Sequence, residues 1–222
     1  MNPAPAFVLD VPVGPLNHFV RLIGSNPPTA LNPQPTAFVG PFAAVIGDVR
    51  IGANVFIAPS VTLRADEGTP FSIGANTNLQ DGVILHGLKA ETVRVNGEPF
   101  SIFIGEGVTC AHGALVHGPC FVGNGGFIGF KSIVFNAVLE EGVYVGNGAV
   151  VTNGARVGRG RFVPPGAVID SQAKSDALRP VPESQEEFAH EVQRVNREFP
   201  AAYSMHFGSM RCSCGLACER AR

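Results

Sequence analysis

The sequence has little charge, no long apolar run and no targeting pattern at its start. Charged residues make up 15% of the 222 residues, and the formal net charge is only −2. The chain therefore lacks the basic footprint of a protein that binds nucleic acid or anionic membranes. No apolar run approaches the roughly 18 residues of a membrane-spanning helix, and no charged-then-apolar secretory signal opens the chain. We expect a soluble cytoplasmic protein with neither kind of partner.

Aliphatic residues instead recur every six positions, and many precede Gly, Asp or Asn, which form tight turns. Short strands separated by tight corners at a fixed period of this length are typical of a parallel β-helix. A β-sandwich would instead alternate, with turns roughly every 8–12 residues and no such register. The residues in register are Val39, Val45, Ile51, Ile57, Leu63, Ile73, Leu79, Leu85, Ile104, Cys110, Val116, Val122, Ile128, Val134, Val145, Val151, Val157, Val163 and Ile169.

This register divides the chain into three parts. We predict an all-β fold, with an extended, proline-rich segment over residues 1–36, a β-helix over residues 37–171, and a C-terminal α-helix and cysteine-containing tail over residues 172–222. Eighteen residues would form one coil of a three-sided prism, and coils would stack at ~4.8 Å. Two insertions break the register, four residues after Leu63 and thirteen after Leu85. Insertions on a regular scaffold commonly carry function.

The register also predicts where three histidines point. His86 and His117 each follow an inward aliphatic residue, and the 31 residues between them minus the 13-residue insertion leave 18, one coil. Arg64 falls one coil earlier in the same column. Two imidazoles stacked at ~4.8 Å can share one metal ion at Zn–N distances of ~2.0–2.1 Å.

His112 belongs to the preceding side of the prism, with Asp81 one coil below it and Gln80 beside Asp81. It should face away from the stacked pair, so that a neighbouring copy in a closed three-fold ring would have to supply it. The alternative is that all three are surface histidines held by hydrogen bonds. The stacking and the third, outward-facing histidine favour a metal site shared between copies.

Three segments, residues 64–70, 78–87 and 112–119, resemble the γ-class carbonic anhydrases. Residues 129–137 and the cysteine-bearing tail more narrowly resemble the amino-terminal domain of the carboxysome-assembly protein CcmM. The resemblance covers roughly residues 36–200. It implies a left-handed β-helix, a homotrimer with metal at its subunit interfaces, and the reversible hydration of CO₂ to bicarbonate, in the cytoplasm or the carboxysome.

The resemblance also assigns the metal ligands. It implies that His86 and His117 of one subunit and His112 of the next bind Zn²⁺, for which iron or cobalt can substitute. It gives Gln80 and Glu67 the task of holding and deprotonating the metal-bound water. The chemistry agrees, because three imidazoles leave an open position and Zn²⁺ lowers the pKa of bound water from 15.7 to about 7.

The neighbouring charges are open to two interpretations. The resemblance implies that Arg64 and Asp81 form an ion pair across the interface, either with an indirect catalytic role or, together with Asp66, as a purely structural network. The chain also departs from the family. Where the archetypal member carries a proton-shuttling glutamate, this sequence has Lys89. Glu91 in the same insertion is a candidate substitute, and the alternative, which we favour, is that Glu91 is only a solvated loop charge.

The C-terminal part contains a predicted helix and three clustered cysteines. Residues 184–187 read as a capping box, and apolar residues at helical spacing predict a helix over about 184–199. Cys110 and Cys120 occupy inward positions and should be inert core thiols. A Cys212–Cys218 disulfide is implied by the resemblance to the CcmM branch, where it would serve as a redox switch of the tail.

Three functions follow as hypotheses. The first is a zinc-dependent carbonic anhydrase. The second is a scaffold of the same fold with weak or lost catalysis, partnered by carboxysome shell or Rubisco assembly proteins. The third is a hexapeptide acyltransferase, which shares the fold but does not explain two stacked histidines surrounded by Arg64, Gln80 and Asp81.

Overall fold

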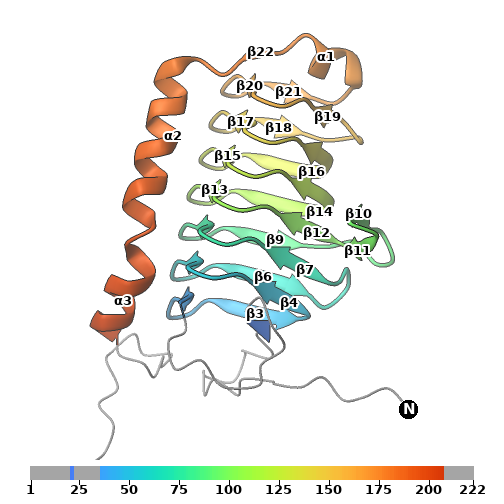
Figure 1. The fold of residues 1–222 in the computed structure, drawn as a ribbon. Helices are drawn as coiled ribbons and strands as arrows, with labels where there is room; N and C mark the ends of the chain where they lie inside the picture. The colour runs from blue at the N-terminus through green and yellow to red at the C-terminus, as the bar shows by residue number, and fades with distance from the viewer. Residues whose placement is uncertain (1–20, 23–35, 208–222) are drawn as a thin grey trace, which may run out of the picture.

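The computed structural model describes residues 21–22 and 36–207, in which the chain winds into a left-handed parallel β-helix of stacked three-sided coils (Figure 1). The first side consists of β2 (Phe38–Val39), β5 (Phe56–Ile57), β8 (Asn78–Leu79), β13 (Thr109–Cys110), β15 (Phe127–Ile128), β17 (Tyr144–Val145) and β20 (Arg161–Val163), with β22 (Arg179–Pro180) antiparallel at its end.

The other two sides join into one sheet because β14 (Leu115–Val122) and β16 (Ile133–Leu139) run across the corner between them. Their remaining strands are β1 (Arg21–Leu22), β3 (Ala44–Gly47), β4 (Val49–Ile51), β6 (Thr62–Ala65), β7 (Phe71–Ile73), β9 (Ile84–His86), β12 (Ile102–Ile104), β18 (Val150–Val151), β19 (Arg156–Val157) and β21 (Val168–Ile169).

The core is the column of aliphatic residues that the period predicts. Leu63, Leu85, Val116 and Val134 are successive Cα partners in neighbouring coils, and none is exposed. All the residues named above as in register are buried except Val39, which is partly buried against the core. Each such aliphatic side chain contributes about 1.5–3 kcal/mol when it is removed from water.

The thirteen-residue insertion folds as a β-hairpin that projects from the prism (Figure 1). Its strands are β10 (Val93–Val95) and β11 (Glu98–Phe100). Asn96 and Gly97 both have positive φ, as the tight turn of a two-residue hairpin requires. Arg50 anchors it, since the guanidinium pairs with Glu98 and lies 5.2 Å from the centre of the Phe100 ring.

Three helices follow the prism: α1 (Gln172–Asp176), α2 (Glu183–Asn196) and α3 (Phe199–Phe207). Figure 1 shows α2 running along one side of the stacked coils. Phe188 of α2 contacts Phe127, which stacks on Tyr144. None of the helices in the described part of the chain is long and apolar enough to cross a membrane.

The predicted helix is confirmed in position, but its predicted cap is wrong. The N-cap residue is Pro182 in an extended conformation, with no side-chain hydrogen bond, and Ser184 lies within the first turn. The carbonyl of Pro182 accepts from the amides of Gln185 and Glu186. The fixed φ of proline suits the start of a helix, although its side chain offers no acceptor to the first helical amides.

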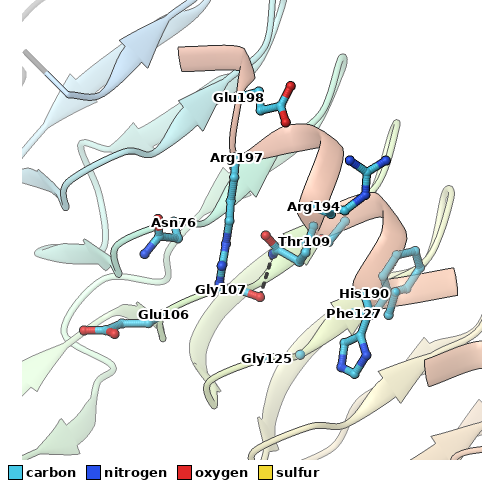
Figure 2. A pocket seen from close by; sticks show the side chains of 13 residues that line it. Asn76, Glu106, Gly107, Thr109, Gly125, Phe127, His190, Arg194, Arg197 and Glu198 are labelled. Carbon is cyan, nitrogen blue, oxygen red and sulfur yellow. Dashed lines mark hydrogen bonds between the residues drawn. The ribbon is translucent and has the colours of Figure 1, made fainter. Parts of the chain in front are cut away.

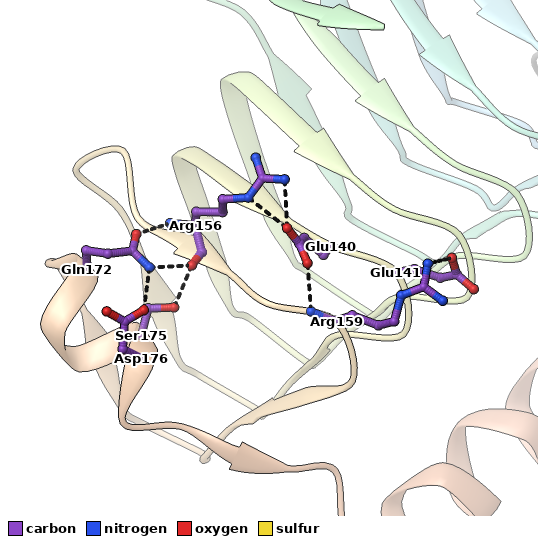
Figure 3. A network of polar contacts seen from close by, with 7 residues as sticks. All are labelled: Glu140, Glu141, Arg156, Arg159, Gln172, Ser175 and Asp176. Carbon is purple, nitrogen blue, oxygen red and sulfur yellow. Dashed lines mark hydrogen bonds and ion pairs between the residues drawn. The ribbon is translucent and has the colours of Figure 1, made fainter.

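A polar network holds α1 over the last coils (Figure 3). Glu140 accepts hydrogen bonds from the Arg156 side chain at 2.7 Å and from the Arg159 amide at 3.0 Å. Gln172 and Ser175 of α1 bind the backbone of Arg156. These contacts tie the chain to the prism where it leaves the repeat.

Both ends of the sequence lie largely outside the described residues. Of the predicted N-terminal segment, only residues 21–22 and 36 are described, and β1 pairs in parallel with β4. The predicted Cys212–Cys218 disulfide also lies outside them.

Candidate metal centre

Two of the three predicted histidines stack on one side of the prism. His86 ends β9 and His117 lies in β14, and the two are Cα partners. Arg64 of β6 is the Cα partner of His86 one coil earlier. The column predicted from counting residues is therefore present.

The two imidazoles meet edge to face, with His86 Nδ1 3.1 Å from His117 Nε2. His117 Nδ1 lies 3.2 Å from the carbonyl oxygen of Gly118, which can only accept a hydrogen bond. His117 Nδ1 therefore carries the proton, and His117 Nε2 is left as an acceptor when the ring is neutral. In the metal-free pair His86 Nδ1–H donates to it, whereas both facing nitrogens must offer lone pairs when they bind one metal ion.

The other ring nitrogen of His86, Nε2, faces carboxylates. His86 Nε2 is buried and has no hydrogen-bond partner among the described residues, and it lies 3.6 Å from Asp66 and 3.7 Å from Glu67. Both carboxylates belong to the four-residue insertion after β6. Two carboxylates beside Nε2 favour a proton on that nitrogen, which leaves Nδ1, the nitrogen that faces His117, as the potential metal ligand.

Arg64 holds one of these carboxylates. Its guanidinium hydrogen-bonds Asp66 at 3.1 and 3.2 Å. Partial burial raises the pKa of Asp66, but the hydrogen bond and positive charge of Arg64 outweigh it and hold the pKa below its ordinary value of 3.8. Asp66 therefore stays ionised beside His86. The predicted partner of Arg64, Asp81, contacts His112 instead within this chain.

His112 lies on a different side of the prism, in the turn after β13. Its Nδ1 is 3.2 Å from Asp81, and both side chains are more than half exposed. A carboxylate beside Nδ1 favours a proton there and leaves Nε2 facing outward as a potential ligand. Gln80 is buried next to Asp81 and donates to Asn78 at 3.3 Å, and no described residue hydrogen-bonds its side-chain oxygen.

The donors of one chain make an incomplete metal site. Among the described residues, no three His, Cys, Asp or Glu side chains form a group that could hold a metal ion. The His86–His117 pair nevertheless fits two of its ligands. Two nitrogens each ~2.0–2.1 Å from one tetrahedral ion lie about 3.4 Å apart, close to the observed separation of 3.1 Å.

Two phenylalanines lie beside these histidines, at positions for which the sequence pattern above predicts no role. Phe130 stacks on His112 with ring centres 5.7 Å apart, and Phe135 meets His117 edge to face at 5.2 Å. Each follows its histidine by 18 residues, one coil. Counting 18 residues forward from each histidine would therefore have found both phenylalanines.

A separate hollow of about 660 Å³ lies between α2 and the corners of the prism (Figure 2). His190, Arg194 and Arg197 line it from the helix, and Gln193 crosses it to hydrogen-bond the carbonyl of Gly107 at 2.6 Å. None of the three predicted metal ligands lines it. It is distinct from the histidine pair.

No model of a known protein family matches the chain. The carboxysome assembly protein CcmM of Nostoc is 46% identical over 169 residues, 76% of this chain but 30% of that protein, so the chain spans less than a third of that relative. The carbonic anhydrase of Methanosarcina thermophila is 38% identical over 196 residues, 76% of this chain and 73% of that enzyme.

A crystal structure of a hexapeptide transferase family protein from Anaplasma phagocytophilum matches the fold with a TM-score of 0.61 and 27% identity, covering 77% of this chain and 90% of that one. The shared fold does not decide between transferase and anhydrase chemistry. The sequence relationship decides the family, because 38% identity extends along most of the Methanosarcina enzyme. The chain belongs to the γ-class carbonic anhydrase family, within which the amino-terminal region of CcmM is a close homologue.

Proposed function

We propose that the chain catalyses the reversible hydration of CO₂ to bicarbonate as a zinc-dependent homotrimer. Each site would take His86 and His117 from one subunit and His112 from the next, and iron or cobalt could replace zinc. The observation that carries the proposal is the stacked pair, in which His86 Nδ1 and His117 Nε2 face each other 3.1 Å apart.

The incompleteness of the site supports the trimer. His112 presents an exposed ring on another side of the prism, where it cannot join the pair of its own chain. The face that carries the pair also exposes apolar residues, since Ile84, Ile133 and Val168 are 43%, 37% and 47% exposed. These three lie in one register column of β9, β16 and β21. A second copy on this face would bury them and bring its own His112.

A bound zinc ion would supply the positive charge that makes water acidic near neutral pH. The residues of the chain would handle the proton. Glu67 lies 3.7 Å from His86 Nε2, and about half of its side chain is in contact with solvent, so it can accept a proton and release it to water. Arg64 keeps Asp66 ionised and fixed beside the pair. Gln80 offers an unpartnered carbonyl oxygen for a hydrogen bond.

Mixing two inactive variants tests the shared site. His112→Ala and His117→Ala should each abolish zinc-dependent CO₂ hydration in stopped-flow assays. When the two are unfolded, mixed in equal amounts and refolded, about one quarter of the interfaces should combine an intact His112 with an intact pair, and about one quarter of the activity should return. His190→Ala, on α2, is the matched control. No recovery from mixed trimers, or full activity in His112→Ala, would eliminate the shared site.

A second candidate is a carboxysome scaffold of the same fold with little activity. The similarity to CcmM and the exposed Lys89 at the position of the family's proton-shuttling glutamate favour it. Partners would then be shell or Rubisco assembly proteins, and a Cys212–Cys218 disulfide would regulate the tail. If the chain is a scaffold, a trimer with full zinc content will remain inactive in both its reduced and its oxidised form. Lys89→Glu will then restore turnover. Activity of the unmodified trimer excludes it.

A further inference from the structure

Two exposed aromatic rings lie directly above the proposed ligands. Phe130 and Phe135 are each 37% exposed, although phenylalanine usually buries its ring. Each contacts a histidine one coil earlier, His112 and His117 respectively. Burial against a second copy would account for exposed rings, but it does not account for both of them lying against proposed metal ligands.

The contacts around His112 clamp its ring between two neighbouring coils. Asp81 lies one coil below and approaches Nδ1 at 3.2 Å. Phe130 lies one coil above, with its ring nearly parallel at an angle of 13°. Because 56% of the His112 side chain is exposed, little else restricts its rotamers. The clamp therefore selects both the orientation of the ring and the nitrogen that faces outward.

His117 has the same two kinds of contact. The carbonyl of Gly118 holds Nδ1 at 3.2 Å, and Phe135 meets the ring edge to face at an angle of 85°. Each histidine thus has an oxygen acceptor at Nδ1 and a phenylalanine one coil on. The nitrogen left for the metal is then Nε2 in each ring, which faces outward in His112 and faces His86 Nδ1 at 3.1 Å in His117.

We propose that Phe130 and Phe135 are positioning residues of the metal centre, which hold His112 and His117 in the ligating rotamer before the metal binds. This inference rests on the proposed function. A side chain already fixed in its bound rotamer loses less conformational entropy on binding, so affinity rises without a new contact to the metal. Aromatic contacts of this kind change an equilibrium constant by about two- to tenfold.

The first experiment measures zinc affinity by competition with a chelator. Phe130→Leu keeps the apolar bulk but removes the ring, and it should weaken zinc binding by about two- to tenfold. Phe130→Tyr keeps the ring and should bind as the unmodified protein does. Phe121→Leu is the matched control, because Phe121 stacks on Phe103, also one coil away, at 5.4 Å and 5° but touches no histidine of the site.

A second measurement needs no metal. Stacking on Phe130 should displace the NMR signals of the His112 ring protons in the metal-free protein, and Phe130→Leu should abolish that displacement while Phe121→Leu preserves it. Unchanged zinc affinity in Phe130→Leu, or an equal loss in Phe121→Leu, would overturn the inference. If Phe130→Leu alters the mass of the assembly, the same zinc titration of Phe135→Leu tests the inference in its place. If His117→Ala leaves the zinc affinity unchanged, the proposed function is refuted instead.

Discussion

The substitution Gly87→Ala tests how tightly the scaffold fixes the first histidine. Gly87 directly follows His86, and a Cβ there would lie 2.1 Å from Ser101 Oγ and 2.8 Å from the carbonyl oxygen of Gly68. Real Cβ atoms essentially never approach so closely. The turn that carries His86 would therefore have to move, and overpacking of this kind costs about 1–3 kcal/mol.

A second substitution, at Ser101, separates the contributions to this loss of stability. Ser101 is fully buried, and its hydroxyl has no hydrogen-bond partner in the described part of the chain. An unpartnered buried hydroxyl costs about 1–3 kcal/mol, so Ser101→Ala should leave the protein as stable or make it more stable. Ser101→Ala also removes the 2.1 Å contact with the new methyl group. The double variant should therefore be about 1 kcal/mol more stable than the two single effects predict.

Urea unfolding followed by circular dichroism measures these free energies, because the chain has no tryptophan for fluorescence. Gly158→Ala is the control: its Cβ would meet nothing closer than 3.8 Å, and the free energy of unfolding should stay within about 0.5 kcal/mol. Gly87→Ala should also weaken zinc binding, since His86 moves with the turn. The packing argument would be refuted if Gly87→Ala were as stable as the unmodified protein. It would also be refuted if the effects of Gly87→Ala and Ser101→Ala on the free energy of unfolding were strictly additive.

Three further predictions concern stability and thiol reactivity. Leu85→Ala should lower the free energy of unfolding by about 2–5 kcal/mol in urea, because it opens a cavity beneath His86; a loss under 1 kcal/mol would contradict the packed core. Burial raises the pKa of Cys110 and Cys120 to about 12, so neither thiol should react with a disulfide reagent at pH 8 until the protein is unfolded. Hydrogen bonds from the Arg159 amide and the Arg156 side chain lower the pKa of Glu140 below its ordinary value of 4.5. Ionised Glu140 therefore stabilises the fold above pH 4.5, and this stabilisation is lost as the pH falls through the lowered pKa. Glu140→Gln should therefore lose less stability on acidification than the unmodified protein in pH-dependent thermal unfolding, and equal losses would contradict the role of Glu140.

The sequence by itself determined the repeat and the column of the first two histidines. A six-residue period of aliphatic residues imposes one inward position per side, and the sterics of the corners are local, as the positive φ of Asn76 and Gly107 shows. Counting residues then places His117 over His86 without any knowledge of the rest of the structure. The same counting places Phe130 over His112.

Only the tertiary structure decided the contacts outside the period. The insertions do not repeat, so their sequence did not reveal the hairpin after His86 or the approach of Asp66 to that ring. Arg64 could pair with several carboxylates, and its choice of Asp66 depends on distances that an aperiodic loop sets. α1, α3 and the proline cap of α2 likewise depend on how the chain meets the end and sides of the finished prism. A periodic chain fixes its own register through local sterics, whereas the pairing of side chains is a competition among groups that only folding brings together.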